Sequence, residues 1–97
     1  MIESFESKGL KKFFESGDKS GLSAQQINKI GMILALLNQA SKPGEMDFPG
    51  SDYHPLKGDR KGEYAVKVTG NYRITFKFDK KTGTAFDVNY EDYHWQW

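Results

Sequence analysis

Apolar side chains near the start of the chain fall at helical spacing. Leu10, Phe13 and Phe14 stand at positions i, i+3 and i+4, which predicts a short amphipathic helix. Gly17 is placed to end that helix in the left-handed conformation that other residues resist. Ahead of the helix, residues 2–5 are long enough for a short strand at most.

A second, broader apolar stripe predicts a longer helix that continues to about residue 40. Its members are Ile27, Ile30, Ile33, Leu34 and Leu37. Just before it, Ser23 and Gln26 have the spacing of a capping box, in which each side chain bonds to the backbone N–H of the other residue. Gly31 lowers the helix propensity, and we expect it to allow a close approach to the sheet. Pro43 and Gly44 stop the helix.

Beyond residue 62 the apolar period changes from helical to alternating, which predicts three strands at about 64–68, 72–78 and 84–90. Turn residues separate them, so the strands form an antiparallel meander with one apolar face. In the last strand that face is expected to hold Thr84, Phe86, Val88 and Tyr90. Because the apolar face needs the helices as cover, the predicted class is α+β: a small twisted antiparallel sheet with two N-terminal helices packed on one face.

Residues 41–62 form a long connection that contains four glycines and all three prolines of the chain. A loop of this length in so small a chain is usually functional or ordered by contacts elsewhere.

Composition limits the classes of protein that remain. Ninety-seven residues are enough for one modest core, so we expect a single domain over residues 1–97. Zero cysteines exclude disulfides and thiolate chemistry and fit a reducing compartment. No apolar run is long enough for a signal peptide or a membrane span. We therefore expect a soluble, cytoplasmic protein.

The net charge of +1 predicts no polyanionic partner by itself, but the charges are unevenly distributed. Residues 54–81 carry eight basic side chains against three acidic ones, a local net charge of +5. Strand alternation places six polar side chains on the face away from the helices: Lys67, Arg73, Thr75, Lys77, Asp87 and Asn89. Such a face fits either an RNA backbone or ordinary solvation, and the pattern alone does not separate the two.

Two histidines are candidates for proton transfer, because histidine titrates near working pH. They are His54 and His94, and each follows a tyrosine. There is no metal-binding signature, phosphate-binding loop or nucleophilic serine motif, so we expect no metal and no cofactor. The remaining His, Lys, Arg and Tyr side chains suit the cleavage of RNA by its own 2′-hydroxyl, which requires only proton transfer and positive charge.

Four blocks of sequence carry a resemblance to a known family. They are Lys8-Gly9-Leu10-Lys11-Lys12-Phe13-Phe14, His54-Pro55-Leu56-Lys57-Gly58-Asp59-Arg60, Gly70-Asn71-Tyr72-Arg73-Ile74-Thr75-Phe76 and Asn89-Tyr90-Glu91-Asp92-Tyr93-His94. In this order and spacing the chain resembles the HigB toxins of bacterial type II toxin–antitoxin pairs, within the RelE/ParE superfamily. The resemblance implies a ribosome-dependent endoribonuclease that cuts mRNA in the decoding site and so inhibits translation. It also implies a HigA-like helix-turn-helix antitoxin as partner.

The resemblance assigns roles to individual positions. The implied catalytic residues are His54, Lys57, Arg73, Tyr93 and His94. The resemblance also implies orienting roles for Asn71 and Asp92, and the polar sheet face adds Lys67 and Lys77 as expected RNA contacts. Some relatives carry an arginine in the strand where this chain offers Lys67, and lysine keeps the charge but loses the planar fork that grips a phosphate. Trp95 and Trp97 extend beyond the usual Tyr-His ending.

Two other functions remain open from the residues alone. One is a ParE-like poison of DNA gyrase, which shares the fold but leaves the His, Lys and Arg set unexplained. The other is a catalytically weak relative that mainly binds its antitoxin, a reading that the low net charge favours.

Overall fold

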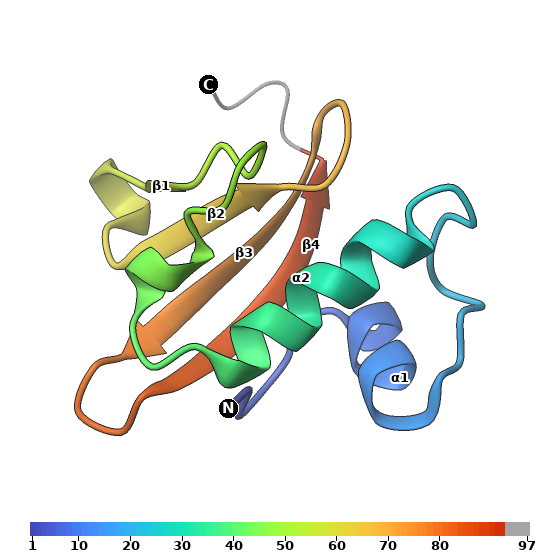
Figure 1. The fold of residues 1–97 in the computed structure, drawn as a ribbon, viewed down its shortest axis with the longest axis horizontal. Coiled ribbons are helices and arrows are strands. Elements are labelled where there is room, and N and C mark those ends of the chain that lie inside the picture. Colours follow the sequence, from blue (N-terminus) through green and yellow to red (C-terminus); the bar gives the residue numbers. More distant parts are fainter. Residues whose placement is uncertain (93–97) are drawn as a thin grey trace.

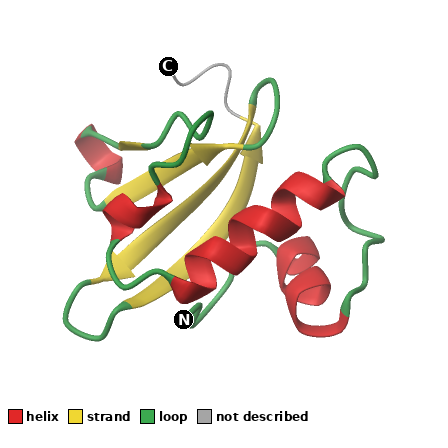
Figure 2. Cartoon of the chain, in the orientation of Figure 1, coloured by secondary structure: helices red, strands yellow, loops and turns green. Residues whose placement is uncertain are grey.

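A computed structural model describes residues 1–92 of the chain. Two α-helices, α1 (Lys8–Ser16) and α2 (Ile27–Gln39), precede four strands: β1 (His54–Pro55), β2 (Glu63–Lys67), β3 (Tyr72–Asp79) and β4 (Thr84–Asp92). The strands form one antiparallel sheet in the order β1-β2-β3-β4. Both α-helices pack on the same side of this sheet (Figures 1 and 2). The predicted α+β class and the three predicted strands are confirmed.

The first helix has caps at both ends. The Ser7 hydroxyl accepts a hydrogen bond from the Leu10 N–H, which satisfies one of the free donors of the first turn. Gly17 ends the helix with φ 74°, as predicted, and its N–H donates to the Phe13 carbonyl. Leu10 is buried, whereas Phe14 is exposed, with 5.6 Å between the centroids of its ring and the ring of Phe5.

The second helix begins at Ile27, and the predicted capping box is wrong. Gln26 is the N-terminal flanking residue, and no side chain caps the helix. Ser23 instead closes a turn, because its backbone carbonyl accepts from the Gln26 N–H at 3.0 Å. The Gln26 side chain accepts a hydrogen bond from the Tyr90 hydroxyl of β4. A tertiary contact with the sheet has therefore replaced the local cap.

Gly31 makes its close approach to the other helix rather than to the sheet, which corrects the expectation from the sequence. A Cβ built on Gly31 would lie 3.5 Å from the ring of Phe13 in α1. The glycine therefore lies where α2 passes over an aromatic ring of α1.

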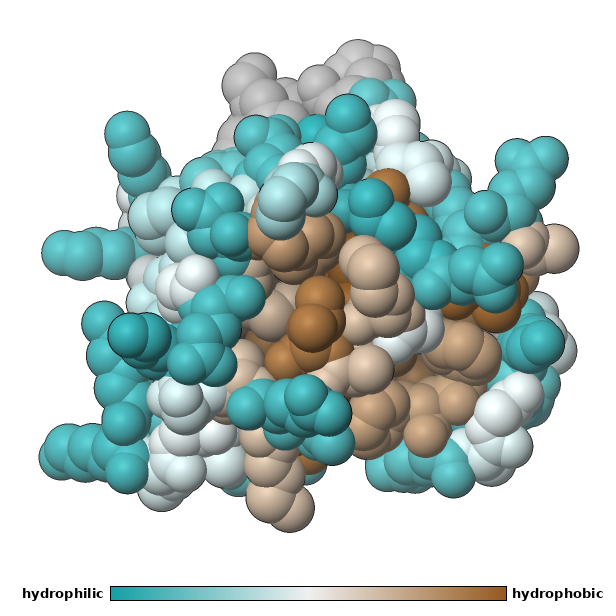
Figure 3. All heavy atoms as spheres, in the orientation of Figure 1, coloured by the Kyte–Doolittle hydropathy of each residue, from teal (hydrophilic) through white to brown (hydrophobic). Residues whose placement is uncertain are grey.

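The core lies between α2 and the helix-facing side of the sheet (Figure 1). The five residues of the predicted α2 stripe are all buried, and four of them, all but Ile27, belong to a core cluster with Val66, Ile74, Phe76, Ala85 and Val88 of the strands and with Val68, which follows β2. The opposite face of α2 is also apolar and exposes Met32 and Leu36, and Figure 3 shows apolar surface gathered over this helix. No helix within residues 1–92 is long and apolar enough to cross a membrane.

The short strand expected at residues 2–5 is reduced to two bridges. Ile2 and Phe5 pair in parallel with Ala85 and Val88 on the free edge of β4. The Glu3 N–H donates to the Ala85 carbonyl at 2.7 Å, so the N-terminal segment partly covers that edge.

The long connection of residues 41–62 is ordered. It contains two 3₁₀ turns, η1 (Pro43–Met46) and η2 (Gly58–Arg60), and it contributes β1, whose two residues pair with Ala65 and Tyr64 of β2. Strand β1 was not predicted. The consequence for function is that the connection brings His54 onto the sheet.

A bulge in β4 shifts the alternation that the sequence predicted. Thr75 pairs with Asn89 and Lys77 with Phe86, so two residues of β4 lie opposite Phe76 alone. One of them, Asp87, has the left-handed φ of 51°. Because of this shift Ala85, and not Phe86, joins the main core cluster, so the predicted inward position of Phe86 is wrong.

Candidate active site

The strand register decides which side chains share the sheet face opposite the helices, called here the outer face. Residues directly opposite one another in a sheet point to the same side. Three rows cross this face: His54, Ala65, Thr75 and Asn89; Lys67, Arg73 and Glu91; Glu63, Lys77 and Phe86. The predicted polar face is therefore present, and the connection adds His54 to it.

The outer face is less open than its polar residues suggested. Thr75 is 1% exposed and Arg73 is 9% exposed. Leu56, which follows β1, packs with Ala65 in a small apolar cluster separate from the main core. Although it lies away from the helices, this face is thus buried at its centre, where the connection of residues 41–62 contributes part of the cover.

Arg60 of η2 is the centre of a charged network on this face. Its guanidinium donates to both carboxylate oxygens of Glu91 on β4, at 2.9 and 2.6 Å, and to both oxygens of Glu63 on β2, at 2.9 and 3.2 Å. The Thr75 hydroxyl donates to the same Glu91. Bidentate pairing of this kind fixes orientation as well as charge. The network therefore ties η2 to β2 and β4 and links β4 to β3.

The pKa values within this network follow from its hydrogen bonds. Burial by itself raises the pKa of Glu91, but hydrogen bonds from Arg60 and Thr75 outweigh it, and the net pKa lies below the ordinary value. The hydrogen bonds that Arg60 donates to Glu91 and Glu63 raise the pKa of Arg60. The guanidinium of Arg60 is thus engaged by two carboxylates, so we regard Arg60 as a structural residue.

Arg73 lies at the start of β3 with a fixed guanidinium. Its Nη1 donates to the backbone carbonyls of Gly70 and Tyr72, at 2.8 and 3.1 Å. Its Nη2 lies 3.8 Å from a carboxylate oxygen of Asp52, and the side chain is 11% exposed. An arginine held in this way presents its charge without further ordering, as stabilisation of a developing anion requires.

His54 is oriented by a backbone contact. Its Nδ1 lies 2.8 Å from the carbonyl oxygen of Asp52. A carbonyl only accepts hydrogen bonds, so Nδ1 carries the proton and the lone pair of the neutral ring is on Nε2. This tautomer can accept a proton at Nε2.

The predicted lysines differ in their surroundings. Lys57, which precedes η2, is exposed, and Lys67 is half-buried beside Arg73 in its cross-strand row. Lys77 forms an ion pair with Asp87 at 3.3 Å. Asn71 is exposed in the turn between β2 and β3. That turn and the end of β4 lie at the same end of the sheet (Figure 1).

Asp92 lies on the other side of the sheet from Arg73. It pairs directly with Tyr72, whose ring stacks on Tyr90 at 5.2 Å on the helix-facing side. Burial raises the pKa of Tyr90, and the charges of Tyr72 and Asp92 add to this effect. The predicted residues Tyr93 and His94, with Trp95 and Trp97, lie outside the described residues.

The structure adds two residues to the neighbourhood of the site that the sequence reading did not select. Asp52 contacts both His54 and Arg73. Glu91 lies within the block of residues 89–94 that carries the family resemblance but received no role there, and the structure places it at the centre of the hydrogen bonds from Arg60 and Thr75. No group of three or more His, Cys, Asp or Glu side chains within residues 1–92 is placed to hold a metal ion.

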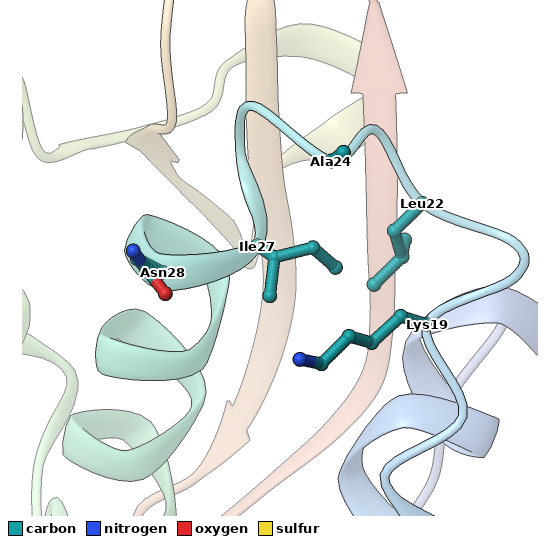
Figure 4. A pocket seen from close by; sticks show the side chains of 5 residues that line it. All are labelled: Lys19, Leu22, Ala24, Ile27 and Asn28. Carbon is teal, nitrogen blue, oxygen red and sulfur yellow. The ribbon is translucent and has the colours of Figure 1, made fainter.

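A hollow of about 260 Å³ opens between the segment before α2 and the first turn of that helix. Lys19, Leu22, Ala24, Ile27 and Asn28 line it, and Figure 4 shows Leu22 and Ile27 facing one another across it. None of the predicted site residues contributes to this hollow, so it is distinct from the outer face.

Comparisons with known proteins agree with the resemblance seen in the sequence. Residues 3–94 match the family model described as RelE-like toxin of type II toxin–antitoxin system HigB. The chain is 46% identical to Endoribonuclease HigB of Proteus vulgaris over 94 residues, which cover 97% of this chain and the whole of that protein. The chain also matches the solution structure of conserved hypothetical protein HP0892 from Helicobacter pylori. This match covers 96% of each chain, with 22% sequence identity and a TM-score of 0.47. The protein thus belongs to the HigB family of RelE-like toxins of type II toxin–antitoxin systems.

Proposed function

We propose that the protein is a ribosome-dependent endoribonuclease that cuts mRNA in the decoding site of the translating ribosome. It would act in the cytoplasm and be held inactive by a HigA-like helix-turn-helix antitoxin. The observation that carries the proposal is that the register of β1, β2 and β3 places His54, Lys67 and Arg73 on one face of the sheet. Family membership and the 46% identical endoribonuclease support it.

The proposed chemistry needs proton transfer and positive charge, and no metal or cofactor. In the proposed reaction His54 accepts the proton of the ribose 2′-hydroxyl at Nε2, and the 2′-oxygen attacks the adjacent phosphorus. Arg73, with Lys57 and Lys67, stabilises the added charge on the pentacovalent phosphorus. The 5′-oxygen leaves with a proton that we assign to the Tyr93–His94 pair. The products are a 2′,3′-cyclic phosphate and a free 5′-hydroxyl.

The test is primer extension on a defined mRNA in a reconstituted bacterial translation system, with and without ribosomes. We expect cuts that require ribosomes and that the Arg73→Ala variant makes about 100-fold more slowly, the usual effect of removing one donor to a developing anion. Lys80→Ala is the matched control, because Lys80 is an exposed cation just beyond the opposite end of β3. An Arg73→Ala variant that cleaves at the wild-type rate would refute the role of Arg73.

A further inference from the structure

Asp52 lies in the segment just before β1 and contacts two proposed catalytic residues. Its backbone contacts one of them, and its side chain contacts the other. Its backbone carbonyl accepts the hydrogen bond from His54 Nδ1 at 2.8 Å. Its carboxylate lies 3.8 Å from Arg73 Nη2, too far for a hydrogen bond but within the range of an ion pair.

The residues on either side of Asp52 hold it in place. Ser51 is buried, and its carbonyl accepts from the backbone N–H of Lys67 on β2 at 2.7 Å. The ring of Tyr53 stacks on Tyr64 with 5.9 Å between centroids. Between these anchors Asp52 has a φ of 49°, a left-handed conformation that Asp and Asn tolerate better than other non-glycine residues. The backbone of Asp52 is thus held beside Arg73.

The two partners of the Asp52–Arg73 pair differ greatly in exposure. The side chain of Arg73 is 11% exposed, and two backbone carbonyls hold its Nη1. The side chain of Asp52 is 63% exposed. An incoming phosphate would therefore meet a guanidinium that is held in place. The carboxylate that faces its Nη2 is exposed and can turn away into solvent.

We propose that Asp52 weakens the hold of this site on RNA phosphate. In the protein without RNA its carboxylate neutralises Arg73 Nη2. A phosphate that binds Arg73 has to displace that carboxylate and then lies beside its charge. Two anions compete for one guanidinium, and like charges a few ångströms apart repel. The inference rests on the proposed function, because it takes Arg73 to be a phosphate contact.

The first test measures the affinity of Asp52→Asn for a 2′-O-methyl oligoribonucleotide, which lacks the attacking hydroxyl and is not cleaved. Asparagine keeps the size of the side chain and its tolerance of positive φ, so it removes only the charge. We expect about five-fold tighter binding at 50 mM salt, and a smaller gain at 300 mM because salt screens the repulsion. Equal or weaker binding by Asp52→Asn would overturn the proposal.

The sequence offers a matched control in Asp87, the other non-glycine residue with positive φ within residues 1–92. It also pairs with a cation, Lys77, at 3.3 Å. Asp87→Asn changes the same charge on the same type of backbone but releases Lys77 instead of Arg73, so any gain in affinity that it gives should persist in an Arg73→Ala background. The gain from Asp52→Asn should instead vanish in an Arg73→Ala background. If the gain persists there, Asp52 does not act through Arg73 and the proposal fails.

A second measurement separates this proposal from the proposed function. Titration with inorganic phosphate, followed by the NMR signals of the Arg73 side chain, reports the anion site without any RNA cleavage. Tighter phosphate binding by Asp52→Asn in a protein that cleaves no mRNA would sustain the role of Asp52 and refute the endoribonuclease. If the wild type cleaves mRNA but Asp52→Asn binds phosphate no more tightly, the endoribonuclease is sustained and the proposed role of Asp52 is refuted.

Discussion

Arg60 and Glu91 are 31 residues apart in the chain and meet on the outer face through two hydrogen bonds of 2.9 and 2.6 Å. This pair joins η2 to the last strand, and Glu63 and Thr75 complete the network from β2 and β3. The segment between His54 and Arg60, which contains Lys57, is therefore attached to the sheet at both ends: by β1 at one and by this ion pair at the other.

Loss of the Arg60 guanidinium should destabilise the fold. Arg60→Ala leaves two half-buried carboxylates, Glu63 and Glu91, without their shared cation. We expect the free energy of unfolding, measured by urea denaturation, to fall by about 2 kcal/mol, since charge-assisted hydrogen bonds are lost and their acceptors stay partly desolvated. Arg60→Lys keeps the charge but not the planar fork, so its free energy of unfolding should lie between those of the wild type and Arg60→Ala. If Arg60→Ala unfolds at the same urea concentration as the wild type, the network contributes nothing to stability.

The same network predicts a pH dependence of stability. The pKa of Glu91 is lower in the folded protein than in the unfolded chain, so the unfolded chain binds more protons as the solution is acidified. The contribution of Glu91 is complete above its ordinary pKa of about 4.5 and is lost as the pH falls through the lower folded value. Glu91→Gln removes this contribution.

Urea denaturation at several pH values measures this effect. At pH 7 we expect Glu91→Gln to unfold at a lower urea concentration than the wild type, and we expect the difference to shrink steadily below pH 4.5. Asp18→Asn serves as the comparison: Asp18 also has a lowered pKa, chiefly through hydrogen bonds from Ser20, but it is fully exposed. A wild-type advantage over Glu91→Gln that is constant from pH 7 to pH 3 would contradict the linkage.

Two glycines of the helical layer should respond in opposite directions to alanine. A Cβ at Gly31 would meet the ring of Phe13 at 3.5 Å, an ordinary van der Waals distance, and alanine favours the helix. We expect Gly31→Ala to stabilise the protein by about 0.5–1 kcal/mol. Gly17 has φ 74°, so Gly17→Ala should destabilise it by about 1 kcal/mol. Thermal unfolding of both variants measures the two signs, and a loss of stability in Gly31→Ala would show that the helices need a closer approach than the structure has.

The sequence predicted the regular parts of this fold because their signals are local. The α2 stripe and the alternation in β2 and β3 each span several consecutive residues, so neighbouring positions support the same assignment. Strand β1 was missed because it has only two residues, one of them proline, and it forms only by pairing with β2. The capping box failed because a hydrogen bond with Tyr90, 64 residues away, holds the Gln26 side chain.

The candidate site was predictable to a similar extent. Motif blocks and alternation selected His54, Lys67 and Arg73, and the register places these three on one face. Nothing local marks Asp52, because its importance comes from an unusual φ and from a contact with a residue 21 positions later in the chain. The motif that selected Asp92 carries no information on the side of the sheet it occupies, and only the pairing with Tyr72 shows that this is the side away from Arg73.

The two half-buried lysines of the outer face should contribute unequally to cleavage. Lys67 is directly opposite Arg73, whereas Lys77 lies four residues further along β3 and is already paired with Asp87 at 3.3 Å. A cation that is neutralised by a carboxylate has less to offer a phosphate, and distance from Arg73 weakens its field further. We expect Lys67→Ala to reduce ribosome-dependent cleavage about ten-fold and Lys77→Ala less than two-fold. Lys67→Arg should at least retain the wild-type rate, because arginine adds a second donor to the phosphate. Rates that fall equally in Lys67→Ala and Lys77→Ala would mean that RNA follows the whole length of β3, in which case the Lys77–Asp87 pair must open when RNA binds.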